Sequence, residues 1–138
     1  MSEVDAQTTD FVTALARLLS DPSLRLQFCE EPEHVARQIG VAQEDWHSFV
    51  SISPEQLNRQ AETLLNKRWH EVRRLVPKTI EMLGSEAVDL FRFYATKEWP
   101  QGHRRHSVDA HRFLRFLISN EIAKPEKYEM IRIRRMAN

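Results

Sequence analysis

The fold class of this chain is decided by residues 66–106, which read NKRWHEVRRLVPKTIEMLGSEAVDLFRFYATKEWPQGHRRH. Arginines and aromatic residues recur there at helical spacing, and Pro77 and Gly84 divide the stretch. Proline cannot continue a helix and glycine favours a helix end, so the pattern predicts consecutive helices. The stretch holds no phosphate-binding loop, nucleophile motif or complete metal motif. What it specifies best is a helical surface.

A long helix is predicted to lead into Pro77. It begins at Ser53-Pro54-Glu55-Gln56, a capping box with proline at the first helical position. One broad stripe of this helix is apolar, as is typical of a helix buried against neighbours. The stripe comprises Leu57, Ala61, Leu64, Leu65, Arg68, Trp69, Val72, Leu75 and Val76.

The rest of the chain predicts helices as well. After Gly84 we expect helices at residues 85–96 and 107–122, the second capped by Ser107. Pro125 is expected to open a last helix. That helix is predicted to complete the core with its apolar side chains rather than to form a mobile basic tail. The side chains expected to face the core are Tyr128, Ile131 and Met136.

Shorter helices are predicted N-terminal to Ser53. Thr8, Thr9 or Asp10 can cap a helix that ends at Asp21, while Pro22 and Pro32 open two more. Gly40 ends the third, and residues 45–50 suggest a brief fourth.

No useful strand pattern or internal repeat occurs. We therefore predict an all-α fold: one domain spanning residues 1–138, a bundle of about seven helices whose long central helix is interrupted at Pro77. Residues 1–52 form an acidic short-helix lobe and residues 53–138 a basic long-helix lobe.

Composition favours a cytoplasmic protein that folds without disulfides. The 138 residues are 41% hydrophobic and 29% charged, which suits a single globular core. Cys29 is the single cysteine, so no intramolecular disulfide can form, and we expect it to be a small core residue. The N-terminal residues lack the basic and apolar regions of a signal peptide, and no membrane span is predicted.

The zero net charge hides a division along the chain. Residues 1–62 hold 4 Lys and Arg against 11 Asp and Glu, a formal charge of −7. Residues 63–138 hold 16 against 9, a formal charge of +7. Such a division fits either two lobes that attract each other or a surface for an anionic partner, and we favour the first interpretation.

Metal binding and catalysis are both weakly supported by the residue patterns. His103, His106 and His111 are the candidate metal ligands, but no cysteine or carboxylate pair completes a tetrahedral set. Cys29 is followed by two glutamates, which disfavour a reactive thiolate. No glycine elbow accompanies the serines near His47. We therefore predict no catalytic residues and no cofactor, with a small metal-binding protein as a second alternative.

Nucleic-acid binding is the first alternative, because basic residues are frequent in the C-terminal half. Arg68 is a special case: it lies within the apolar stripe, so its guanidinium can instead pair with a buried carboxylate such as Glu71 or Asp89. The basic residues that can contact phosphates are Lys67, Arg68, Arg73, Arg74, Lys78, Arg104, Arg105, Arg112, Arg115, Arg132, Arg134 and Arg135.

Two segments resemble known families. The first, within residues 55–120, is carried by Arg68-x-x-Glu71, Pro77-x-Thr79, Leu83-Gly84, Leu90-Phe91, Tyr94-Ala95 and Trp99-Pro100. It resembles small helical companion proteins of multinuclear non-haem iron peptide-modifying enzymes, the group that includes the methanobactin companion subunit. The second, from Phe11 to Trp46, contains LARLLSDPSLRLQFCEEPEHVARQIGV at residues 15–41. It resembles the short helical units of the small subunit of extradiol dioxygenases and of some peptide-leader domains.

The companion resemblance implies an accessory protein that docks on a cytosolic iron enzyme and helps to present a peptide to it. Companions usually carry a further peptide-recognition domain, which this sequence lacks room for, so the docking function is the better supported part. We predict a non-enzymatic protein that binds a partner protein. Its predicted contact residues are Trp69, Arg73, Arg74, Trp99, Arg104 and Arg105. Trp69 and Tyr94 are also candidates for the core, and for these two residues we favour that interpretation.

Overall fold

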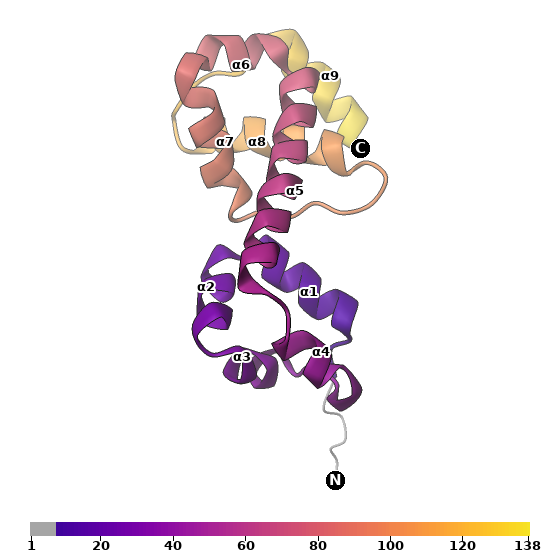
Figure 1. Cartoon of the computed structure of the whole chain (residues 1–138). Helices are drawn as coiled ribbons and strands as arrows, with labels where there is room; N and C mark the ends of the chain where they lie inside the picture. Colours follow the sequence, from indigo (N-terminus) through magenta and orange to yellow (C-terminus); the bar gives the residue numbers. More distant parts are fainter. Residues whose placement is uncertain (1–7) are drawn as a thin grey trace. The chain divides into compact units, whose positions relative to one another are not determined.

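The computed structural model describes residues 8–138, and every regular element in that range is a helix (Figure 1). A single isolated bridge pairs Thr9 with Val41, and residues 8–138 form no strand. The prediction of an all-α fold is therefore confirmed. The described chain contains nine α-helices, whereas about seven were expected.

The chain divides into two compact units, Met1–Glu62 and Thr63–Asn138, called unit 1 and unit 2 below. The boundary between them lies inside the long helix α5 (Pro54–Leu75), whereas the predicted lobe boundary at residue 52 lies before it. The charge division at residue 62 coincides with this boundary, so unit 1 is the acidic part and unit 2 the basic part of the sequence.

The described part of unit 1 is a set of short helices with local caps. They are α1 (Phe11–Ser20), α2 (Pro22–Glu30), α3 (Pro32–Ile39), a 3-10 turn at Gln43–Asp45, α4 (Trp46–Val50) and the first residues of α5. Asp10 accepts a hydrogen bond from the backbone N–H of Thr13 at 2.8 Å, and Asp21 accepts one from Leu24 at 3.1 Å. Gly40 ends α3 in the left-handed conformation, at φ 83°, which costs glycine little.

The core of unit 1 is apolar. Phe28 and Phe49 meet edge to face with ring centroids 5.2 Å apart, and Leu18 and Val35 are fully buried beside them. Cys29, which we expected in this core, is exposed on α2. It directly follows Phe28, and a one-residue step along a helix turns the side chain about 100° away from the core-facing position.

Unit 2 contains the rest of α5, then α6 (Pro77–Leu83), a 3-10 turn at Gly84–Glu86, α7 (Ala87–Ala95), α8 (Arg105–Ser119) and α9 (Lys127–Ala137). Pro77 begins a new helix, because Val76 before it leaves the helical conformation at φ −130° and ψ 58°. The core is built around Phe91 and Phe113, whose ring centroids lie 5.5 Å apart.

Two predicted helix starts in unit 2 are wrong. Helix α8 begins at Arg105 and has no side-chain cap, so Ser107 lies inside its first turn. Helix α9 is capped by Glu126, which accepts hydrogen bonds from the N–H groups of Tyr128 and Glu129, and Pro125 lies before the cap.

The face of α9 that meets the core also differs from the prediction. Ile133 is fully buried and Met130 packs against the core, whereas Tyr128 is 70% exposed and Ile131 and Met136 are also exposed. Residues 129, 130 and 133 of α9 face the core, and in this orientation the Glu129 carboxylate reaches the start of α6. The Glu129 carboxylate accepts from the N–H groups of Lys78 and Thr79 at 2.7 and 2.8 Å.

Residues 8–138 include no helix that has both the length and the apolar character of a membrane span.

Candidate functional site

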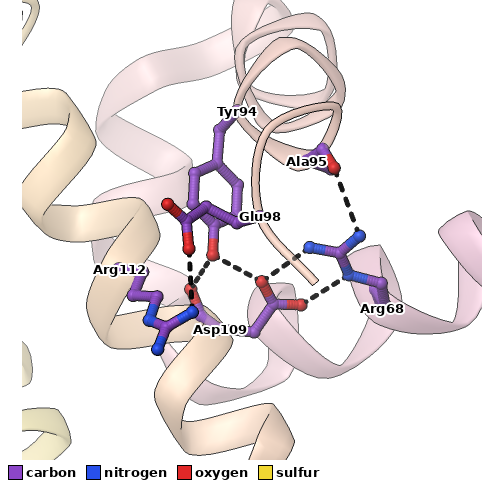
Figure 2. A network of polar contacts seen from close by, with 6 residues as sticks. All are labelled: Arg68, Tyr94, Ala95, Glu98, Asp109 and Arg112. Atoms are coloured by element: carbon purple, nitrogen blue, oxygen red, sulfur yellow. Dashed lines mark hydrogen bonds and ion pairs between the residues drawn. The ribbon is translucent and has the colours of Figure 1, made fainter. Parts of the chain in front are cut away.

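A buried ion pair lies at the centre of unit 2 (Figure 2). The Arg68 guanidinium donates from Nε to Oδ2 of Asp109 at 2.8 Å and from Nη2 to Oδ1 at 2.9 Å. The side chain of Arg68 is 11% exposed and that of Asp109 is 2% exposed. This two-point geometry joins α5 to α8 and is the arrangement in which arginine binds a carboxylate most strongly.

Two further groups complete this network. The hydroxyl of Tyr94 donates to Asp109 Oδ1 at 2.6 Å, and Arg68 Nη1 lies 3.4 Å from the carbonyl oxygen of Ala95 at the end of α7 (Figure 2). The pKa of Tyr94 is raised above its ordinary value, first by burial and then by the negative charge of Asp109. Tyr94 therefore stays protonated and serves as a hydrogen-bond donor.

Aromatic rings enclose the guanidinium. Its carbon Cζ lies 5.7 Å from the ring centroid of Phe91 and 5.4 Å from that of Trp99. A cation near aromatic rings is stabilised by their quadrupoles, more so where water is excluded. Arg68 is thus a fixed structural group that positions Trp99.

The predicted carboxylate partners of Arg68 are wrong. Glu71 accepts instead from Arg74 at 2.7 Å on the exposed side of α5, and Asp89 is exposed on α7. Arg68 does pair with a buried carboxylate, as predicted, but the carboxylate is that of Asp109, 41 residues along the chain. Nothing in the local pattern singles out Asp109, because its partner comes from a different helix.

A second ion pair lies close to this network but is exposed. Arg112 Nη1 donates to Glu98 Oε1 at 2.8 Å, and both side chains are well over a third exposed (Figure 2). An exposed pair of this kind contributes little to stability.

A pocket of about 540 Å³ lies against the buried ion pair. Helix α5 lines it with Leu64, Lys67, His70 and Glu71, in addition to Arg68. This volume lies within the range of about 300 to 1,000 Å³ that is typical of ligand pockets. We refer to this feature as the Trp99 pocket.

The remaining walls of the Trp99 pocket come from the loop after α7 and the start of α8. Residues 99–102 form the loop wall, while Arg105, His106 and Asp109 come from α8. Gly102 adopts φ 95°, a conformation that an L-residue rarely takes, so glycine lets the loop turn into α8 at this point. The pocket therefore combines one aromatic ring, aliphatic surface and several cationic side chains.

The predicted contact residues are only partly brought together. Trp99 and Arg105 line the Trp99 pocket. Arg73 and Arg74 are exposed on α5, and Arg104 is exposed and donates to the backbone carbonyl of Asn138.

The two aromatic residues that we assigned preferentially to the core do pack there. Trp69 is half-buried, with its ring centroid 5.6 Å from that of Phe91, and Tyr94 is buried. Of the other pocket residues, Lys67 was predicted only as a possible phosphate contact and His106 only as a possible metal ligand, and His70 was not predicted to belong to any site. Lys67 and His70 are both on α5, one turn apart, a spacing that places them on the same side of the helix.

The three candidate metal ligands do not share a site. His106 lines the Trp99 pocket, His103 is exposed in the preceding loop, and His111 lines a second pocket of about 680 Å³ with Arg112 and Arg115. Within residues 8–138, no group of three or more His, Cys, Asp or Glu side chains is placed to hold a metal ion.

His111 has an unusual environment. Its Nε2 atom is buried and has no hydrogen-bond partner in the described structure. The pKa of His111 is lowered, first by burial and then by the positive charges of Arg115 and Arg134.

Several of the basic residues considered for nucleic-acid binding hold partners within the chain. Arg68 and Arg112 pair with carboxylates, and Arg132 donates to the backbone carbonyl of Leu75. Arg105 Nη1 donates to the carbonyl of Gly102 at 3.2 Å, beside the Trp99 pocket. Arg68, Arg105, Arg112 and Arg132 thus have partners within the chain.

Comparison of the chain with curated proteins and with solved structures found no match. A protein-family model does match, over residues 51–119, and its description is SCO6045-like, C-terminal domain. The matched segment contains α5 to α8 and hence Arg68, Tyr94, Trp99 and Asp109. This family is neither of the two that residues 55–120 and 11–46 resemble, so both resemblances stay predictions. Since the match covers half of its 138 residues, the chain belongs to the SCO6045-like, C-terminal domain family.

Proposed function

We propose that this protein is a non-catalytic accessory protein that docks on a partner protein through the Trp99 pocket. The observation that carries the proposal is the arrangement of this pocket: exposed cationic side chains and a half-buried tryptophan surround a floor whose own charges are already paired. Aromatic anchors with an arginine rim are typical of protein interfaces.

The buried carboxylate favours a structural function over a catalytic one. Both oxygens of Asp109 accept hydrogen bonds from Arg68, and Oδ1 also accepts from Tyr94. A general base must reach its substrate within hydrogen-bond distance, whereas the side chain of Asp109 is only 2% exposed and is held by the Arg68 guanidinium. The network instead fixes α5, α7 and α8 around the pocket, as a preformed binding site requires.

The companion-protein resemblance of residues 55–120 suggests the first partner to test. In that interpretation the partner is a cytosolic iron enzyme that modifies a peptide, and this chain supplies a docking surface without metal ligands of its own. The proposal of docking depends on the pocket and does not depend on this choice of partner.

The test is site-specific photo-crosslinking in a nuclease-treated extract of the source organism. A photoreactive amino acid is placed at Gln101, an exposed residue of the pocket wall, and as a control at Gln38, exposed on α3. We expect one protein to be crosslinked from position 101 and not from position 38.

A matched pair of substitutions makes this test specific. Arg105→Glu reverses a charge at the pocket and Arg135→Glu makes the same change on α9, outside the pocket. Arg105→Glu should abolish the crosslink and Arg135→Glu should leave it intact. Equal crosslinking by both variants, or the absence of any protein specific to position 101, would contradict the proposed function.

A further inference from the structure

The Trp99 pocket carries a surplus of positive charge. Its two acidic side chains are both engaged, Asp109 by Arg68 and Glu71 by the 2.7 Å hydrogen bond from Arg74. Lys67 and Arg105 also line the pocket, and no further acidic residue does. Lys67 and Arg105 therefore have no acidic partner among the pocket residues and can attract a negatively charged occupant.

Two histidines also line the pocket. His70 and His106 face the pocket from α5 and α8, and both lie close enough to Glu71 to act on its charge. The pKa of Glu71 is lowered chiefly by its hydrogen bond from Arg74, with smaller contributions from the charges of Arg74, His106 and His70. The lysine and arginine side chains that line the pocket thus come from two helices, α5 and α8.

The same pocket offers apolar surface. Leu64, Pro100 and Trp99 line it, and the ring centroid of Trp99 lies 5.4 Å from Cζ of Arg68. Tryptophan supplies a large rigid contact area at a low cost in conformational entropy. The occupant that matches this lining has an anionic group and an apolar or aromatic group close together.

The dimensions favour a protein segment over a nucleic acid. A volume of about 540 Å³ accommodates a few side chains and is bordered by one loop and two helices. Binding to a nucleic-acid backbone requires cations repeated along an extended surface. In unit 2, Arg68, Arg74 and Arg112 are instead paired with carboxylates.

We propose that the Trp99 pocket binds an acidic segment of the partner protein, with an Asp or Glu carboxylate between Lys67 and Arg105 and an adjoining apolar side chain against Trp99. This inference rests on the proposed docking function and specifies the chemistry of the partner. Lys67 and Arg105 attract the carboxylate of the segment, and Trp99 anchors its apolar side chain.

The test uses the full chain as bait for a display library of random peptides. Enriched peptides should be acidic and should contain an aromatic or large aliphatic residue. In fluorescence anisotropy, the best peptide should bind Arg105→Glu and Trp99→Ala at least about tenfold more weakly than the wild type. Its affinity for Arg135→Glu should stay within about twofold of the wild-type value.

A charge swap separates direct contact from a folding defect. The double variant Lys67→Glu with Arg105→Glu should bind a peptide in which the acidic residues are replaced by lysine, and the wild type should not. Recovery of this kind requires a folded pocket in direct contact with the peptide. Enrichment of basic peptides, or of peptides with no common charge, would overturn the inference. It would also be overturned if an oligonucleotide bound the pocket more tightly than the acidic peptide and displaced it.

Failure of this inference is distinguishable from failure of the proposed function. If a partner protein is crosslinked from Gln101 in an Arg105-dependent manner but acidic peptides do not bind, docking stands and the acidic-segment inference is wrong. If acidic peptides bind at the pocket but no protein is crosslinked from Gln101, the pocket chemistry stands and the docking function is wrong.

Discussion

Unit 1 and unit 2 both enclose an apolar core of helices, but they differ in the polar groups that they bury. The buried residues described in unit 1 are all apolar, and its acidic caps Asp10 and Asp21 are exposed. Unit 2 buries Thr79, Asp109 and Glu129. Its helices are therefore held by specific long-range hydrogen bonds as well as by hydrophobic contact.

This difference indicates that unit 2 has the more fixed geometry of the two units. Apolar contacts tolerate rearrangement, whereas a buried ion pair is stable only in the arrangement that satisfies all its donors and acceptors. The pocket lies in the unit that has such networks, directly against one of them. The buried network thus gives the pocket walls a defined position.

The largest effect is expected from Asp109→Ala. It leaves the Arg68 guanidinium buried without a partner, which costs about 3 kcal/mol or more in free energy of unfolding. Urea denaturation measures this loss. Arg112→Ala, which removes an exposed ion pair, is the control and should cost less than about 1 kcal/mol.

The same variant tests whether the two units are energetically separate. In hydrogen exchange, Asp109→Ala should reduce the protection of α7 and α8 amides and spare those of α1 to α3. Equal loss of protection in both units would contradict the contrast between them, because it would show that they unfold as one cooperative unit.

The double variant Arg68→Leu with Asp109→Leu should be more stable than Asp109→Leu alone, since it leaves no unpaired charge.

Glu129→Ala is expected to have the next largest effect. It leaves the N–H groups of Lys78 and Thr79 and the hydroxyl of Thr79 without their buried acceptor. The expected loss is about 2 kcal/mol in free energy of unfolding. Glu81→Ala, at an exposed position on α6, is the control, with an expected change below about 0.5 kcal/mol. A similar small change for Glu129→Ala would mean that the Glu129 cap is not stabilising.

A smaller effect is expected in unit 1 from Asp21→Ala. This change removes the side-chain cap of α2, and such caps contribute about 1 kcal/mol. The loss should be seen in the exchange of α2 amides. Asp21→Asn retains an acceptor of similar shape and should recover most of the stability. If Asp21→Ala cost more than Asp109→Ala, the contrast between the units would be wrong.

The smallest effect concerns pH and His111. Because its pKa in the folded protein is lowered from 6.5, the unfolded chain binds the proton more readily. Its contribution to stability is therefore present above about pH 6.5 and declines as the pH falls below that value. His111→Asn should reduce the loss of stability between about pH 7.5 and about pH 5.5, measured by urea denaturation. Arg134→Gln removes one cause of the lowered pKa and should give an intermediate slope. If the free energy of unfolding of His111→Asn depended on pH as it does in the wild type, His111 would not be a cause of this pH dependence.

Local signals predicted most of the helices. Pro22, Pro32 and Pro77 each occupy the first position of a helix, and Gly40 ends one, because these residues act through their own backbone geometry. The long helix and its start at Ser53-Pro54 also follow from such signals, and Ser53 Oγ accepts from the Gln56 N–H as the capping box predicts.

Predictions that needed knowledge of a distant residue failed or were incomplete. The predicted core-facing side of α9 was wrong, because the Glu129 carboxylate accepts a hydrogen bond from Thr79 in α6, 50 residues earlier in the chain. Ser107 was a plausible cap from its type alone, but the loop before it leads α8 to start at Arg105. Of the six predicted contact residues, Trp99 and Arg105 line the Trp99 pocket, and contact of the six with a partner stays a prediction.

The sequence by itself determined that residues 8–138 have an all-α fold, where most of the helices begin and end, and that the charge is divided near residue 62. These properties depend on neighbouring residues and on the backbone preferences of proline and glycine. Only the tertiary structure decided that Asp109 is the partner of Arg68, and that Lys67, Trp99 and Arg105 border one pocket. Such pairings depend on how separate helices pack, which local periodicity does not encode.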